Sequence, residues 1–337
     1  MSLPTFQAPT ATRAAIRVDG IVKRYPKLTA LDGVSLEIRE GEFFGLLGPN
    51  AAGKTTLISI LAGLARATSG SAQVMGFDVV SQFREARRAL GVVPQELVFD
   101  PFFTVRETLR FQSGYFGLKD NAAWIDEILQ GLGLADKADT NMRALSGGMK
   151  RRVMVAQALV HKPPVIVLDE PTAGVDVELR QTLWRFIRQL HASGRTIVLT
   201  THYLEEAEEL CSRIAMLKAS RVVALDSTAN LLKRFTGLQV MLRLNQALPD
   251  ALRSKLTSGD GSAGSRLRLR VASYDEAAQL LADLRGGGLH LEEAEIQRAD
   301  LEDVFLQVMA ESGGAARPRL RPEVGSPLSP PAERVEA

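Results

Sequence analysis

The sequence predicts an α/β domain followed by a smaller α+β domain. From about Ala14 to Arg234, short runs rich in β-branched residues alternate with longer segments whose apolar residues recur with the period of a helix. Beyond Arg234 the patterns are two strands and then two helices, which is typical of a small α+β unit. The chain has 337 residues, 45% of them hydrophobic, which is enough for one large core and one small core.

Within the larger domain, each element follows from a local pattern. Residues 38–47 read as a hairpin arm and a buried strand, broken at Glu40-Gly41-Glu42. Apolar residues at offsets 0, 3, 4 and 7 then predict a helix over 54–64. Thr104 and Glu107 match a capping box, and 124–132 repeats the helical pattern. The segment 95–144 is therefore expected to be a helical insertion, and with the helix after it we expect a helical subdomain over about 95–160.

The second domain is expected over 236–311. Strands are predicted at 239–244 and 267–271 with a loop at 257–265 between them, and helices at 274–284 and 301–309. From residue 312 to 337, prolines lie among Gly, Ser, Arg and Glu with few apolar residues, which predicts a disordered tail. Residues 1–13 are expected to be a flexible N-terminus.

Composition excludes several classes of partner. Lys plus Arg number 41 and Asp plus Glu 39, a formal charge of +2, which gives no general electrostatic case for binding nucleic acid. A single cysteine, Cys211, allows neither an internal disulfide nor a multi-cysteine metal site, and fits a reducing compartment. Apolar runs stay well below the roughly 18 residues that cross a bilayer, and residues 1–12 lack the pattern of a secretory signal. We therefore expect a cytoplasmic protein with no nucleic-acid partner.

One motif lies between the expected strand that ends near residue 47 and the helix that follows. The segment Gly48-Pro49-Asn50-Ala51-Ala52-Gly53-Lys54-Thr55 fits G-x-x-x-x-G-K-[ST] and is followed by Thr56. Its glycines allow a turn whose backbone N–H groups point at phosphate oxygens, and the helix start adds the positive end of its dipole. Lys54 is expected to neutralise the β and γ phosphates, and Thr55 to offer its hydroxyl to Mg²⁺. The alternative is a glycine turn with a surface lysine.

Two carboxylates follow a short, wholly apolar run. Residues 165–168 predict a buried strand, and Asp169 and Glu170 stand at its carboxyl end, where open α/β sheets bind ligands. We expect Asp169 to hold Mg²⁺ and Glu170 to orient and polarise an attacking water. Without the phosphate loop, the pattern would fit a solvated strand end as well as it fits a catalytic site.

A third motif combines a serine with two glycines. Ser146, Gly147 and Gly148 open a long helix, in which Ser146 is a suitable N-cap. Such a helix start can bind an anion through its N–H groups, so it is a candidate for a second phosphate contact. On its own, the segment is more simply explained as a structural helix start.

These three motifs, in the order in which they stand along the chain, resemble the nucleotide-binding subunit of an ATP-binding cassette (ABC) transporter over about residues 15–235. LSGGM is similar to the signature of that family, GPNAAGKTT to its phosphate loop and VIVLDEPT to its second carboxylate motif. The resemblance implies a P-loop NTPase fold of the ABC cassette type over 14–235: a mixed sheet core with an antiparallel β subdomain and a helical subdomain. It implies ATP as substrate, with Mg²⁺.

Four further roles are implied by the resemblance alone. They are stacking of Tyr25 on adenine, contact of Gln95 with Mg²⁺ and water, a position of Asp176 in the loop facing the other subunit, and contact of His202 with the γ-phosphate. Three of these residues also have a simpler alternative role. Tyr25 can pack on a strand edge, Gln95 can form a hydrogen bond with the backbone, and His202 can cap the next helix.

One position departs from the family pattern. Ala51 stands where the family usually has glycine, and if the loop requires a positive φ there, alanine costs about 1 kcal/mol. We expect the loop to form nevertheless, because Gly48 and Gly53 occupy the two obligatory positions.

The motifs together look like those of ABC-2-type exporter ATPases, most similar to the YadG subgroup. That resemblance implies a separate ABC-2-type membrane permease, a second cassette forming a homodimer, and a position on the cytoplasmic face of the inner membrane. Phe99, Phe102 and Phe103 are candidates for lining the groove that receives the permease, or for packing inside the helical insertion. The competing functions are a soluble ABC ATPase without a membrane partner and a regulatory subunit that binds ATP without hydrolysing it.

Overall fold

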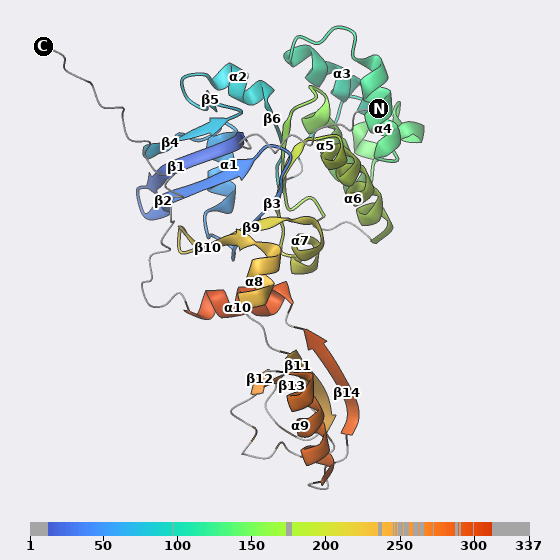
Figure 1. Cartoon of the computed structure of the whole chain (residues 1–337). Helices are drawn as coiled ribbons and strands as arrows, with labels where there is room; N and C mark the ends of the chain where they lie inside the picture. The colour runs from blue at the N-terminus through green and yellow to red at the C-terminus, as the bar shows by residue number, and fades with distance from the viewer. Residues whose placement is uncertain are drawn as a thin grey trace, which may run out of the picture.

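The structure is a computed structural model, and the residues that it describes form three β-sheets (Figure 1). It describes residues 13–311 except 97, 173–176, 235–237, 245, 247, 249–251, 253–255, 259–261, 263–265, 272, 287–288, 290 and 299. The expected disordered tail at 312–337, the flexible N-terminus apart from Arg13, and Asp176 lie outside the described residues. In the part of the chain that is described, none of the helices is long and apolar enough to cross a membrane.

The first sheet is antiparallel, with strand order β2-β1-β4-β5. β1 and β2 are long neighbouring strands whose turn lies at residues 26–27, and one face of each is buried. The short helix α2 follows β5. The bounds are β1 Ala14–Tyr25, β2 Leu28–Arg39, β4 Ser69–Val74, β5 Phe77–Asp78 and α2 Phe83–Arg88.

The second sheet has six strands in the order β10-β9-β3-β8-β7-β6, and all neighbours are parallel except β10 and β9. Its central strands are buried on both faces, as their continuous apolar runs predict. The strands are β3 Phe43–Leu47, β6 Leu90–Val93, β7 Val165–Asp169, β8 Thr196–Thr200, β9 Arg213–Lys218 and β10 Arg221–Ser227. The helices between and after them are α1 Lys54–Leu61, α6 Val177–Ala192, α7 Leu204–Leu210 and α8 Thr228–Arg234.

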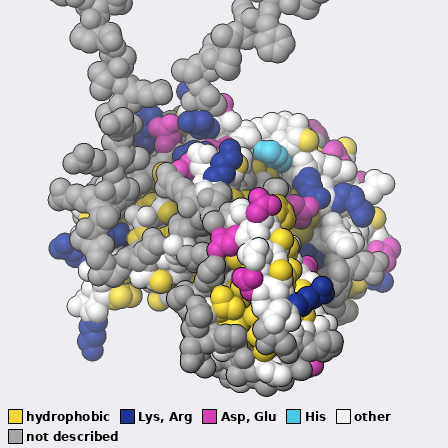
Figure 2. All heavy atoms as spheres, turned by 60° about the horizontal axis from the view of Figure 1, so that its bottom comes forward, with side chains coloured by type: hydrophobic (Ala, Val, Ile, Leu, Met, Phe, Trp, Pro, Cys, Tyr) yellow, Lys and Arg dark blue, Asp and Glu magenta, His cyan; other side chains and the backbone are white. Residues whose placement is uncertain are grey.

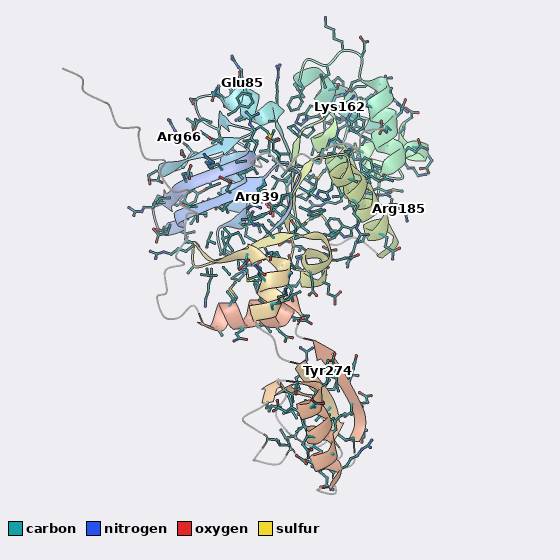
Figure 3. The ribbon with its side chains drawn as sticks, in the orientation of Figure 1. Arg39, Arg66, Glu85, Lys162, Arg185 and Tyr274 are labelled. Atoms are coloured by element: carbon teal, nitrogen blue, oxygen red, sulfur yellow. The ribbon has the colours of Figure 1, made fainter. Side chains whose placement is uncertain are left out.

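A helical subdomain is inserted between β6 and β7. The predicted capping box is present, because the side chains of Thr104 and Glu107 each accept a hydrogen bond from the other residue's backbone N–H at the start of α3. The predicted helix at 124–132 is observed as α4. The elements are α3 Val105–Tyr115, α4 Ala122–Gly131, α5 Gly147–Leu159 and two 3₁₀ turns at Ala135–Lys137 and Met142–Ala144. Lys162 and Arg185 are labelled on this side of the molecule in Figure 3, and Arg66 and Glu85 on the side of the antiparallel sheet.

The third sheet, β12-β13-β11-β14, has its own apolar cluster, which includes residues of α9. The two predicted strands and the first predicted helix of this region are observed. The strand β12, which covers the first two residues of the loop expected at 257–265, was not predicted, and neither was the strand β14. Three of its eight residues are glutamates, so its sequence lacks a strand pattern. The elements are β11 Leu238–Leu244, β12 Leu256–Ser258, β13 Arg266–Val271, α9 Tyr274–Gly286 and β14 Leu291–Arg298. Figure 2 shows acidic and hydrophobic side chains close together on the part nearest the viewer, which is this region.

The last described helix, α10 Leu301–Glu311, packs against α7 and α8, and Asp303 also lies 3.7 Å from Arg268 of β13. Leu301, Val304 and Val308 are buried in the same apolar cluster as the six-stranded sheet and the helical subdomain. Asp300 caps the helix, because its carboxylate accepts the N–H of Asp303 at 2.9 Å. The chain therefore leaves the main core, builds the small sheet and returns to the main core (Figure 1).

Candidate active site

The loop between β3 and α1 requires glycine at two positions. At Gly48 φ is 155° and a Cβ would lie 2.4 Å from the carbonyl oxygen of Leu217; at Gly53 φ is 107° and a Cβ would lie 2.5 Å from that of Ala30. Helix α1 begins at Lys54 without a side-chain cap, which leaves its first N–H groups available to an anion. The loop is therefore built to accept phosphate at a helix start.

Ala51 adopts the left-handed conformation that was in question, with φ at 63°. This costs about 1 kcal/mol for a residue with a Cβ. The loop nevertheless has its expected form, and Ala51 is exposed, so its methyl group needs no space inside the protein.

Lys54 is buried beside the loop it belongs to. Its Nζ donates hydrogen bonds to the carbonyl oxygens of Gly48 at 2.6 Å and Pro49 at 3.1 Å. Burial lowers the pKa of Lys54, and the charges of Glu170 and Asp169 oppose that effect. A positive charge is thus held between the loop and two carboxylates, where it can neutralise phosphate.

Asp169 ends β7 and is 2% exposed. The hydroxyl of Thr55 donates to its Oδ2 at 3.3 Å, and the hydroxyl of Thr200 donates to its Oδ1 at 2.5 Å. A carboxylate and a hydroxyl at this spacing are hard oxygen ligands of the kind that Mg²⁺ takes together with substrate phosphates. The residues present therefore fit a Mg²⁺ ion.

The carboxylate of Glu170, which follows β7, lies close to side chains that follow two other strands. Gln95, after β6, donates from Nε2 to Glu170 Oε2 at 3.1 Å, and His202 Nδ1, after β8, lies 3.6 Å from the same oxygen. The backbone of Glu170 has a φ of 49°, and its N–H donates to the carbonyl oxygen of Thr200 at 3.0 Å, which holds this turn in place. The three predicted catalytic side chains are thus brought together.

A cavity of about 270 Å³ lies over the loop. Gln95 and Glu170 line it, as do Leu28 and Ala30 of β2 and the loop residues Asn50, Ala51, Ala52, Gly53, Lys54, Thr55 and Thr56. Tyr25 is not among the described residues that line it. It is 45% exposed, pairs in register with Leu28, and has Lys23 Nζ 4.7 Å from its ring centroid. Stacking of Tyr25 on a base therefore stays a prediction.

The serine and glycines at the start of α5 lie apart from this cavity. Ser146 caps the helix, since its Oγ accepts the N–H of Met149 at 3.3 Å. Neither Ser146 nor Gly147 nor Gly148 is among the described residues that line the cavity of their own chain. A Cβ added at Gly147 would face open space, so none of the described residues covers that position.

Two buried charged residues at the site were not predicted. Arg151 of α5 is 3% exposed and donates to the carbonyl oxygens of Gln95 at 2.8 Å and Glu170 at 2.5 Å. The run Lys150-Arg151-Arg152, directly before the apolar residues of the same helix, was the available signal.

Glu206 of α7 is the second unpredicted residue, and it is 8% exposed. Its carboxylate accepts hydrogen bonds from Thr172, Thr201 and Trp184, each at 3.1 Å. It thus joins the segments after Glu170 and before His202. The run of glutamates around it looks like a solvated helix face, so no pattern of residues indicated this role.

Comparison with known proteins extends these observations. The family model described as ABC transporter matches residues 31–173. The Nod factor export ATP-binding protein I of Burkholderia thailandensis is 40% identical over 299 residues, covering 88% of this chain and 97% of that protein. The linearmycin resistance ATP-binding protein LnrL of Bacillus subtilis is 34% identical over 307 residues, covering 87% and 97%.

Solved structures of ABC transporter cassettes are also similar to this chain. The structure of an ATP binding subunit of an ABC transporter has a TM-score of 0.62 at 27% identity, covering 66% of this chain and 93% of that one. The cassette MJ0796, in a dimeric post-hydrolysis state bound to ADP and Pi, has a TM-score of 0.59 at 26% identity, covering 63% and 98%. With its phosphate loop and converging carboxylates, this chain belongs to the ABC transporter family, in which it is an ATP-binding subunit and an ATPase.

Proposed function

We propose that this chain is the ATP-hydrolysing subunit of an ABC-2-type exporter of the YadG-like subgroup. Two identical copies close over two ATP molecules and drive a separate permease. The observation that carries the proposal is that Gln95 and Glu170 line one cavity together with Lys54, while His202 lies 3.6 Å from Glu170. Export is supported by relatives whose names refer to Nod factor export and to linearmycin resistance.

The roles of the site residues follow from their positions. The loop N–H groups and Lys54 hold the phosphates, and Thr55, Asp169 and Gln95 hold Mg²⁺, which when bound supplies positive charge to the phosphate oxygens. Glu170 orients and polarises the attacking water. His202, next to it, reaches the γ-phosphate.

The second copy completes each site. Ser146, Gly147 and Gly148 begin a helix that is suited to an anion but do not line their own chain's cavity, so they serve the nucleotide held by the other copy. Asp176 belongs to the loop that faces that copy, and Tyr25 stacks on the adenine. Hydrolysis removes the phosphate bridge between the copies, the pair opens, and the movement is passed to the permease.

Replacing Glu170 by Gln tests the catalytic assignment. The substitution keeps the size of the side chain and a hydrogen-bonding partner for Gln95, so ATP should still bind while turnover falls by at least about 100-fold. ATP should then accumulate a dimer, which size-exclusion chromatography with light scattering detects. Glu209→Gln, at an exposed position of α7, is the matched control and should leave turnover unchanged. Full hydrolysis by the Glu170→Gln protein would remove Glu170 from its role.

We infer that the permease docks in a groove of about 390 Å³ between the antiparallel-sheet side and the helical subdomain. Its walls include Leu64 and Val98, which are 78% and 69% exposed, and it reaches Pro94, the neighbour of Gln95. An occupant would thus contact the segment that carries Gln95. The position of the chain is then peripheral, on the cytoplasmic face of the inner membrane.

The three phenylalanines considered for this groove do not line it. Phe99 packs against the main apolar cluster, and Phe103 packs on Phe111 with ring centroids 4.6 Å apart, so both are used internally. Phe102 is 74% exposed, and its ring lies 5.0 Å from the guanidinium of Arg143.

Membrane fractionation tests the docking. With an ABC-2-type permease co-expressed, the chain should sediment with membranes, and Leu64→Glu with Val98→Glu should release it, whereas Leu306→Glu on α10 should not. A chain that stays in the supernatant whether or not the permease is present would favour a soluble ABC ATPase instead.

A further inference from the structure

The side chain of Arg151 is bound entirely to backbone carbonyl oxygens. Nε donates to Pro171 at 3.2 Å, Nη1 to Pro94 at 2.6 Å and Gln95 at 2.8 Å, and Nη2 to Asp169 at 2.7 Å and Glu170 at 2.5 Å. A guanidinium has five N–H bonds, so these five hydrogen bonds use all of them.

The carbonyl oxygens come from two segments that are far apart in sequence. One is formed by the two residues that follow β6, and the other is the end of β7 with the two residues that follow. The side chains of Gln95 and Glu170 are themselves hydrogen bonded at 3.1 Å. Arg151 therefore holds the backbones of the two residues whose side chains meet over the cavity.

Burial makes this arrangement specific to arginine. Burial lowers the pKa of Arg151, and the charges of Asp169 and Glu170 oppose that effect, so the guanidinium stays charged between them. A lysine has three N–H bonds from one point and cannot span two segments in the same way. The position therefore requires the planar guanidinium group with its several N–H donors, and not only a positive charge.

Helix α5, which carries Arg151, begins at the serine and glycines assigned to the other copy's nucleotide. Arg151 lies five positions after Ser146 in the sequence, which is a rise of about 7.5 Å along the helix. The α5 side chains between Val153 and Leu159 are largely buried in the main cluster, and the helix lies alongside β6. A rigid, well-packed helix therefore connects the proposed contact with one nucleotide to the catalytic side chains that act on the other.

We propose that Arg151 is a positioning residue that sets Gln95 against Glu170 and ties their geometry to the position of helix α5. The inference rests on the proposed function, because it concerns how the catalytic pair is held in place. When the second copy's nucleotide is captured at the start of α5, the helix moves Gln95 and Glu170 as one unit through the five hydrogen bonds of Arg151.

The chain offers a matched control in the next residue. Arg152 is also on α5, is 4% exposed and also donates to backbone carbonyl oxygens, but those belong to Leu132 and Gly133 within the helical subdomain. Arg151→Lys and Arg152→Lys thus make the same chemical change at neighbouring buried positions. Arg151→Gln, which removes the buried charge, is a milder second change should the lysine variant fold poorly.

The test compares turnover with ATP binding in the full chain. Arg151→Lys and Arg151→Gln should lower kcat by about 10- to 100-fold through misplacement of the catalytic pair, while the affinity for ATP changes less than about threefold. In a Glu170→Gln background both should still form the ATP-dependent dimer. Hydrogen exchange of the peptide around Pro94 to Glu96 should rise. Arg152→Lys should leave kcat and that exchange unchanged.

The failure of this inference can be separated from that of the proposed function. An unaltered chain without ATPase activity, or full activity in Glu170→Gln, would count against the proposed function. If the unaltered chain and Glu170→Gln behave as stated but both Arg151 variants keep their kcat, Arg151 does not position the pair. Equal losses of kcat in Arg151→Lys and Arg152→Lys would mean that α5 is merely loosened, which also overturns the inference.

Discussion

At the scale of single residues, charges of opposite sign are buried together where the central strands end. Lys54 and Arg151 are cations whose pKa values are lowered by burial, and Asp169 and Glu170 offset that effect in both cases. Such an arrangement is stable only because each charge has hydrogen-bonding partners, and it makes every member sensitive to substitution. The same principle, without a compensating charge, applies to His161.

Stability should fall as the pH drops from 6.5 towards 4 because His161 resists protonation in the folded chain. Its ring stacks on Phe116 at 3.8 Å and its Nε2 lies 3.1 Å from the carbonyl oxygen of Leu90, and burial lowers its pKa from 6.5 to about 4. Between pH 6.5 and pH 4 the unfolded chain binds a proton at this histidine and the folded chain does not. The contribution of His161 to the free energy of unfolding is therefore complete above pH 6.5 and is lost as the pH falls towards 4.

Urea unfolding measures this effect. Between about pH 7 and pH 5 the His161 contribution should decline by about 2 kcal/mol, and His161→Phe, which keeps the ring stack, should lack that part of the decline. Parallel stability profiles for the two proteins over this range would show that His161 does not titrate as described.

Residues that act through contiguous motifs could be predicted, and residues that act through tertiary contacts could not. Gly48 to Thr55 lie in one run, so their joint geometry follows from the turn and the helix start. Gln95 and His202 were placed by resemblance, and their contact with Glu170 depends on the order of three strands. Arg151 bonds to carbonyl oxygens, which any sequence supplies, so no residue pattern could reveal its partners.

At the scale of elements, short sequence patterns predicted helices and strands best where the element depends only on its own residues. The capping box at Thr104 and the alternating strands of the small sheet follow from short-range chemistry. The glutamate-rich strand β14 is held by its pairing with β11, which the sequence of β14 alone does not express. The packing of α10 is likewise a long-range result.

Helix α10 should stabilise the main core even though it follows the small sheet. Leu301 is fully buried there, and its N–H donates to Glu208 of α7 at 2.8 Å. Leu301→Ala should lower the free energy of unfolding by about 2 to 5 kcal/mol, as expected for a buried leucine. Leu306→Ala, on the exposed face of the same helix, is the control for chemical denaturation. Equal stability of the two variants would place α10 outside the main core.

At the scale of the whole molecule, the proposed account requires two chains for each reaction. The cavity over the phosphate loop is lined by Lys54, Gln95 and Glu170, and the start of α5 lies apart from it. We propose that residues 14–235 form the cassette and residues 236–311 the accessory domain. Helix α10 of the accessory domain packs into the apolar cluster of the cassette. In the proposed account, a movement at the interface reaches both the proposed permease groove and the small sheet.

Complementation between two inactive variants tests the shared site most directly. Lys54→Ala disables the phosphate loop of one chain, and Ser146→Arg blocks the start of α5 in another, so each variant alone should be inactive. In an equal mixture half of the dimers are mixed, and each of these has one intact site, so about a quarter of the original ATPase activity should return. Activity that stays at the level of the separate variants would contradict the account, because the nucleotide would then be held by one chain alone.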